Sequence, residues 1–187
     1  MVNNTGEPYD DDPSSIIRPG EGHGLDFVKL PELEKRTGVT PSGVLRFVVP
    51  EMLANSLDTD AKHIKIVLIR NNDFYQLSVC DNGSKKFSIT DVKMLFSYTN
   101  TASSKRGVYR AQRGALGNAL KCVSGYTYAI PESLGLVPHD IILSSHGEQY
   151  IVKLKPDRIR EVIDSDIVQS SVADDGCNTF IVLSRRV

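Results

Sequence analysis

The stretch PEMLANSLDTDAK, residues 50–62, decides the fold because one helix here carries two different faces. Leu53 and Leu57 are four residues apart, a spacing that places apolar side chains on one side of an α-helix. Another face, at positions i, i+4 and i+7, carries three polar residues: Glu51, Asn55 and Asp58. A solvated surface is the common explanation for one such face taken alone. The alignment of a carboxylate, an amide and a second carboxylate also makes this helix a candidate for a site.

The bulk composition is that of one soluble globular domain. The chain has 187 residues, of which 40% are hydrophobic and 24% are charged, and 22 basic residues stand against 23 acidic ones. This balance does not indicate nucleic-acid binding through bulk charge. The three cysteines lie outside any CxxC spacing, which favours free thiols in a reducing compartment: Cys80, Cys122 and Cys177. Because no secretory signal and no apolar run of ~20 residues is present, we expect a cytoplasmic protein without a membrane segment.

The hydrophobic patterns predict helices first and strands later. Residues 1–24 are rich in Gly, Pro, Asp and Asn and are expected to form a flexible arm, while 25–187 form the folded domain. Helices are expected at 30–36, 42–57 (kinked or restarted at Pro50), 91–96 (capped by Thr90) and 115–123. Strands are expected at 63–69, 75–80, 126–130, 140–145, 149–154, 161–165 and 179–184. This order predicts an α+β fold, a two-layer sandwich.

Three separate segments carry chemistry that fits one ligand. They are E51-x-x-x-N55-S-x-D58, the C80-D81-N82-G83 end of a strand, and R113-G-A-L-G-N118 at the start of a helix. Two glycines at a helix start leave backbone N–H groups that suit phosphates, and an Asn oxygen suits Mg²⁺. A Glu one turn away can deprotonate a water, and an Asp can accept a hydrogen bond from an exocyclic amine. Each segment alone has an ordinary explanation, but together they favour a nucleotide site.

This order of motifs resembles the GHKL ATPases, which have the Bergerat fold and include DNA gyrase, histidine kinases and mismatch-repair ATPases. The resemblance covers roughly residues 40–184 and implies a mixed sheet covered on one face by helices. It implies Glu51 as the water-activating base, Asn55 as the Mg²⁺ ligand and Asp81 as the residue that reads adenine, with Gly83 beside it. It also assigns ATP contacts to Thr179 and to a phosphate-binding lid made of Arg113, Gly114, Ala115, Leu116, Gly117 and Asn118.

Within the superfamily, the stretch FSYTNTASSKRGVYRAQRGALGNALK (96–121) is most similar to the B subunit of type IIB topoisomerases. That likeness implies an ATP-operated clamp, a nucleotide-dependent homodimer and DNA handling within a larger assembly. It also implies a following domain, so we expect the chain to be either a fragment of a longer protein or an independent small relative. One position departs from the family, since Lys85 stands where a second motif glycine belongs.

Two other functions remain open at this stage. The first is the ATP-binding domain of a histidine kinase, although the roughly 40 residues before the Glu51 motif carry Pro and Gly in place of a long helical hairpin. The second is a degenerate nucleotide-sensing module without turnover, which Lys85 favours and the presence of Glu51 and Asn55 disfavours. The long polar segment 97–113 is expected to close over a bound nucleotide.

Overall fold

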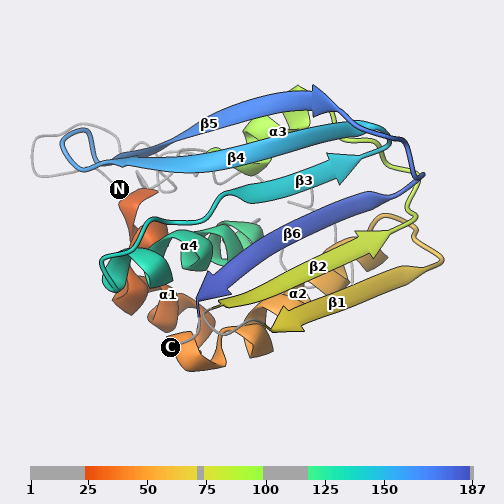
Figure 1. The fold of residues 1–187 in the computed structure, drawn as a ribbon. Helices are drawn as coiled ribbons and strands as arrows, with labels where there is room; N and C mark the ends of the chain where they lie inside the picture. The colour runs from red at the N-terminus through yellow and green to blue at the C-terminus, as the bar shows by residue number, and fades with distance from the viewer. Residues whose placement is uncertain (1–23, 71–73, 99–117, 186–187) are drawn as a thin grey trace, which may run out of the picture.

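A computed structural model describes residues 24–70, 74–98 and 118–185 of the chain. Nearly all of the predicted arm, part of the connection between the predicted strands 63–69 and 75–80, and most of the 97–113 segment lie outside these ranges. The described residues form one sheet with helices packed against it (Figure 1).

The sheet has six strands in the order β1-β2-β6-β3-β4-β5. Their bounds are β1 Ile64–Arg70, β2 Phe74–Asp81, β3 Ile141–Ser145, β4 Glu148–Asp157, β5 Val162–Ser171 and β6 Asn178–Arg185. Every pairing between these described strands is antiparallel. The α+β prediction is therefore confirmed, whereas the prediction of a mixed sheet is wrong for this part of the chain.

The helices cover one face of the sheet, which gives the two layers expected from the sequence (Figure 1). In chain order they are the 3-10 helix η2 Gly24–Val28, α1 Leu30–Thr37, the 3-10 helix η3 Pro41–Gly43, α2 Leu45–Leu57, α3 Ile89–Leu95 and α4 Asn118–Ser133. The opposite face carries no helix among the described residues. Polar and half-buried side chains alternate with core residues along the central strands for this reason.

Three local predictions need correction. Residues 126–130 are not a strand but the middle of α4, whose apolar run is buried by α1 and η2 on one side and β6 on the other. A short apolar run of this kind has no period that separates a strand from a buried helix. The helix α3 begins after Ser88 and not after Thr90, because Ser88 and Asp91 form a reciprocal capping box. The helix α2 continues through Pro50 instead of restarting there.

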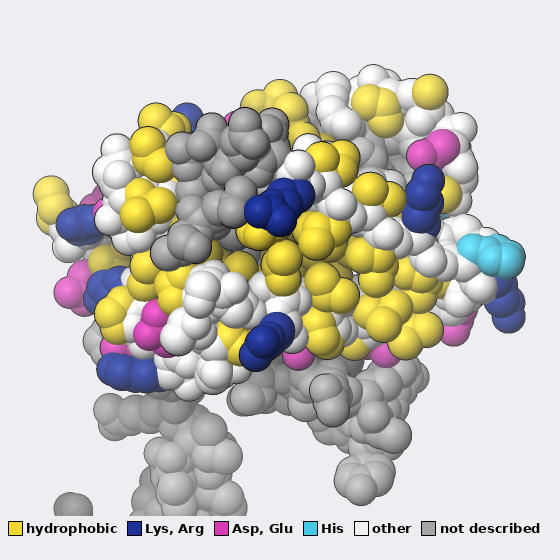
Figure 2. Space-filling view, turned by 60° about the horizontal axis from the view of Figure 1, so that its bottom comes forward, with side chains coloured by type: hydrophobic (Ala, Val, Ile, Leu, Met, Phe, Trp, Pro, Cys, Tyr) yellow, Lys and Arg dark blue, Asp and Glu magenta, His cyan; other side chains and the backbone are white. Residues whose placement is uncertain are grey.

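A row of apolar side chains stays exposed where α2 runs beside the edge strand β1. These residues are Leu53, Leu57, Ile66 and Leu68, with exposed fractions from 37% to 60%. Figure 2 shows apolar side chains gathered on this side of the molecule. The register pairs Ile66 with Val79 and Leu68 with Leu77, so both β1 residues lie on the helix-covered face but beyond the reach of α2.

The helix α4 packs against η2 so closely that one position admits only glycine. A Cβ added at Gly125 would lie 1.9 Å from the carbonyl oxygen of Phe27 and 3.1 Å from a methyl group of Leu33. The contact at 1.9 Å is with backbone, which cannot rotate away. The close approach of α4 to η2 therefore depends on this residue.

We predict that Gly125→Ala lowers the free energy of unfolding by about 1–3 kcal/mol, because the added methyl group forces α4 and η2 apart. Urea denaturation followed by circular dichroism measures the change. Gly43→Ala is the matched control, since its Cβ would meet Thr40 at an ordinary 3.8 Å. Equal stabilities of the two variants would contradict the prediction.

Candidate functional site

Asp81 is the last residue of β2, and its carboxylate is fixed by donors from three parts of the chain. The side chain is 7% exposed. Within the described residues, all the hydrogen bonds to it end on Oδ1, from the backbone N–H of Gly83 (2.9 Å), the hydroxyl of Thr59 (3.1 Å) and the amide of Asn178 (3.3 Å). A buried carboxylate requires such partners. All three donors share one oxygen, so none of them engages Oδ2.

Asn178 is the cross-strand partner of Asp81 and the centre of the polar network. Its Nδ2 donates to Asp81 and to the carbonyl of Gly83 (3.2 Å), while its Oδ1 accepts from the Ser145 hydroxyl at 2.6 Å. The Ser145 hydroxyl in turn accepts from the backbone N–H of Phe87 (2.9 Å). This network joins the ends of β2, β6 and β3 and holds the loop that follows Asp81.

Gly83 is required by a close contact with Thr59. A Cβ at Gly83 would lie 2.2 Å from the Thr59 hydroxyl oxygen, and the residue does not adopt a positive φ. The glycine therefore lets the loop approach the end of α2. Lys85, which departs from the family motif, is exposed and also has an ordinary φ, so it adds no backbone strain. Its ammonium lies 5.4 Å from the centroid of the Phe87 ring.

His146 contacts the same loop from the β3–β4 turn. His146 and Gly147 both have positive φ (44° and 85°), as a two-residue hairpin turn requires. Nε2 of His146 lies 3.2 Å from the carbonyl oxygen of Gly83. A carbonyl can only accept, so the ring donates through Nε2–H. Sequence patterns did not single out His146 or Asn178, although the predicted strand 140–145 ends directly before His146.

The helix α2 brings the predicted base and metal ligand to the same end of the molecule. Thr59, two residues past its end, lies within hydrogen-bonding distance of both the Ser56 carbonyl (2.7 Å) and Asp81. Asn55 is one turn before Thr59 and is half-buried. The end of α2 is thus tied directly to the Asp81 carboxylate.

Glu51, two turns before Thr59, lies near α4. Burial raises the pKa of the Cys122 thiol in α4 to about 11, while Arg36 lowers it and Glu51 raises it further by smaller amounts. Glu51 itself is half-buried. Its position is therefore close to the helix whose start the sequence assigns to phosphate binding.

The start of α4 is only partly described. Residues 113–117 lie outside the described ranges, so the predicted positions of Arg113, Gly114, Ala115, Leu116 and Gly117 are not placed. Asn118 is the first residue of α4, and its Oδ1 is buried without a partner among the described residues. Lys121, one turn further, is 4% exposed beside the rings of Phe27 and Tyr98, and burial lowers its pKa.

Thr179 is not brought together with Asp81. It pairs with Cys80, and side chains alternate along a strand, so Thr179 points to the face without helices. The neighbouring Asn178 occupies the position expected of Thr179. A shift of one residue in β6 exchanges the two faces, and no local pattern specifies that register.

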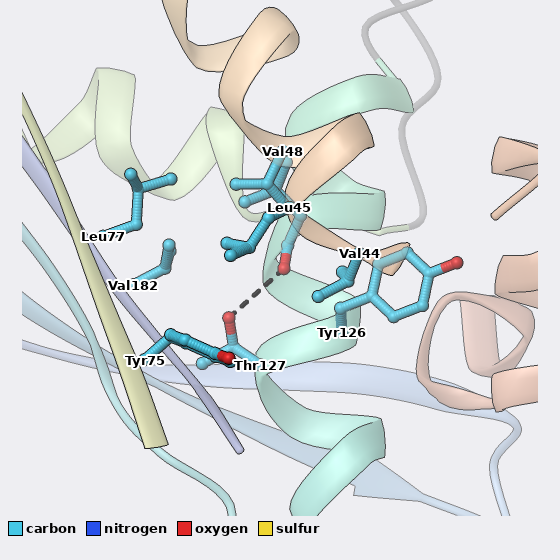
Figure 3. A pocket seen from close by; sticks show the side chains of 9 residues that line it. Val44, Leu45, Val48, Tyr75, Leu77, Tyr126, Thr127 and Val182 are labelled. Carbon is cyan, nitrogen blue, oxygen red and sulfur yellow. Dashed lines mark hydrogen bonds between the residues drawn. The ribbon is translucent and has the colours of Figure 1, made fainter. Parts of the chain in front are cut away.

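A separate apolar pocket lies between α2, α4 and the sheet (Figure 3). Side chains that point into it include Val48 from α2, Tyr126 from α4 and Leu77 from β2. Its one polar group apart from the tyrosines, the Thr127 hydroxyl, donates to the Val123 carbonyl at 3.2 Å. None of the residues predicted for the site lines this pocket.

Comparison with protein families and with curated proteins finds no match for this chain. Among the described residues, no helix is both long and apolar enough to span a bilayer. The same residues contain no cluster of three or more His, Cys, Asp or Glu side chains suited to a metal ion.

We predict that Asn178→Leu lowers the free energy of unfolding by about 1–3 kcal/mol, because Asp81 and Gly83 lose a buried donor and Ser145 loses its acceptor. Thermal and urea unfolding measure the loss. Thr179→Val, one residue along on the opposite face, is the control and should change stability far less. A larger loss for Thr179→Val than for Asn178→Leu would refute the assignment of faces.

Proposed function

We propose that this chain is a Mg²⁺-dependent ATP-binding domain of the GHKL type that hydrolyses ATP. The observation that carries the proposal is the fixed Asp81 carboxylate, whose Oδ1 is held by three internal donors. Its other oxygen is an acceptor with a defined position at the end of the sheet. The exocyclic amine of adenine is a donor of the matching kind.

The geometry of α2 supports placing the phosphates away from this carboxylate and along the helix. Asn55 is four residues before Thr59 and Glu51 is eight before it, which corresponds to roughly 6 and 12 Å of helical rise. A nucleotide with its base at Asp81 would then extend its phosphates toward Asn55 and Glu51. In this arrangement, Asn55 completes the oxygen shell of a Mg²⁺ that the phosphates already hold. Glu51 orients and deprotonates the attacking water.

The start of α4 supplies the remaining phosphate contacts in the proposal. Backbone N–H groups and the positive end of the helix dipole favour anions there. The unpartnered Oδ1 of Asn118 is an acceptor at this helix start, and it suits a water or a Mg²⁺ and not a phosphate oxygen. We also propose, from the sequence resemblance alone, that ATP closes a homodimeric clamp in a DNA-handling assembly.

The proposal predicts that the chain binds ATP more tightly than GTP, and that Asp81→Asn reverses the preference. The substitution keeps an acceptor at Oδ1 for the three internal donors but places an amide NH₂ at the other position. That NH₂ opposes the amine of adenine and suits the O6 of guanine. The expected change in the ATP/GTP affinity ratio is about 10- to 100-fold, the scale of one unpaired buried group.

Isothermal titration calorimetry with each nucleotide and Mg²⁺ measures both affinities. The unfolding midpoint of Asp81→Asn, compared with that of the wild type, controls for damage to the network. Equal affinity of the wild type for ATP and GTP would remove Asp81 from base recognition. If neither nucleotide binds, the chain is not a nucleotide-binding domain at all.

Glu51→Gln and Asn55→Ala should separate chemistry from binding. Glu51→Gln removes the base but keeps the shape, so ATP still binds while single-turnover hydrolysis falls by ~100-fold or more. Asn55→Ala removes an oxygen from the metal shell and should weaken Mg²⁺-dependent binding itself. Glu34→Gln, a carboxylate on α1, is the control for a general effect of charge. Hydrolysis by Glu51→Gln at the rate of an active wild type would exclude Glu51 as the base.

A further inference from the structure

Two of the three cysteines lie side by side on the sheet face that carries no helix. Cys80 is in β2 and pairs with Thr179, while Cys177 precedes β6 and is two residues from Thr179. Side chains at 177 and 179 belong to the same face as Cys80 because strands alternate with a period of two. Both side chains are half-buried, and interaction with the Cys80 thiol raises the pKa of the Cys177 thiol to about 11.

The pair lies directly behind the polar network. Cys80 precedes Asp81 and Cys177 precedes Asn178, and the amide of Asn178 donates to Asp81 across the two strands. A covalent link between the sulfurs would therefore join β2 to β6 one residue from the Asp81–Asn178 hydrogen bond, on the opposite face.

We propose that Cys80 and Cys177 form a reversible intramolecular disulfide when the folded protein meets a peroxide-class oxidant. The sulfur of Cys80 attacks the peroxide, which breaks the O–O bond and gives a sulfenic acid and one water. The sulfur of Cys177 then attacks the Cys80 sulfur, so that an S–S bond forms, the S–O bond breaks and a second water leaves. Each sulfur loses one electron, the peroxide gains two, and both thiol protons end in water.

The order of attack follows from the positions of the two residues. Cys80 is held within the β2 ladder, whereas Cys177 precedes the β2–β6 ladder, so Cys177 is the sulfur that can move to meet an oxidised Cys80.

The backbone at Cys177 can follow the closing bond. An S–S bond of ~2.05 Å is shorter than a contact between two thiols, so one sulfur must move. The β2–β6 ladder starts at Asn178, and Cys177 follows Gly176, which has a φ of 69°. The Cys177 carbonyl accepts from the backbone N–H of His146 at 3.2 Å. A shift of Cys177 therefore also affects His146, whose ring donates to the carbonyl of Gly83.

The test treats the folded full chain with hydrogen peroxide, blocks free thiols with N-ethylmaleimide and maps the cysteines by mass spectrometry without reduction. We expect a Cys80–Cys177 linkage, a mass lower by two hydrogen atoms, a Cys122 thiol that stays unblocked while the protein is folded, and full reversal by dithiothreitol. The buried Cys122, 4% exposed, is an internal control for unfolding. Cys80→Ser and Cys177→Ser should lose the linkage, and Cys122→Ser should keep it.

Three results would overturn the proposal: both thiols remaining free, a linkage that forms only in urea, or a linkage that includes Cys122 or a second chain. A second measurement needs no variant. The oxidised wild type should unfold at a higher urea concentration than the reduced form, because the link constrains the unfolded chain. Unchanged unfolding of a fully linked sample would also contradict the geometry. Neither readout depends on nucleotide, so the proposal can fail or succeed apart from the proposed function.

Discussion

A single oxygen of a buried carboxylate, Oδ1 of Asp81, joins three separate parts of this domain. A carboxylate taken out of water must recover its hydrogen bonds from the protein. The three donors that supply them come from the end of α2, the loop after β2 and the first residue of β6. The helix layer is thereby fixed to the sheet at one end, and the loop after Asp81 takes the shape that Asn178 and His146 allow.

The parts predicted correctly from sequence were those specified by local chemistry. Spacing alone placed Glu51 and Asn55 on one helix, and the Asp-Asn-Gly turn placed Asp81 at a strand end. The predicted strands 140–145, 149–154 and 179–184 lie within a few residues of β3, β4 and β6, and Gly147 and Gly176 mark two of the turns, whereas β5 continues to Ser171, past its predicted end at 165. Ser88 was missed as a cap even though Asp91, three residues on, completes the signature of a capping box.

The parts missed were those set by long-range pairing. Asn178 and Thr179 are adjacent, and only the register with β2 decides which one faces Asp81. The apolar run at 126–130 reads equally well as a strand until α1, η2 and β6 surround it. The role of Gly83 is likewise a tertiary one, since the atom that excludes a side chain there belongs to Thr59. None of these can be read from a window of neighbouring residues.

The central place of β6 in the sheet has a consequence for the order of assembly. Among the described strands, β6 is the last in chain order, and it lies between β2 and β3, where it links the β1–β2 hairpin to the β3–β5 meander. During synthesis both of these units must wait with an open strand edge until β6 emerges. Pairing over such sequence separations is slow, because the loop must close before the contacts form. Until β6 pairs, the unpaired edges of β2 and β3 are open to strands of other chains.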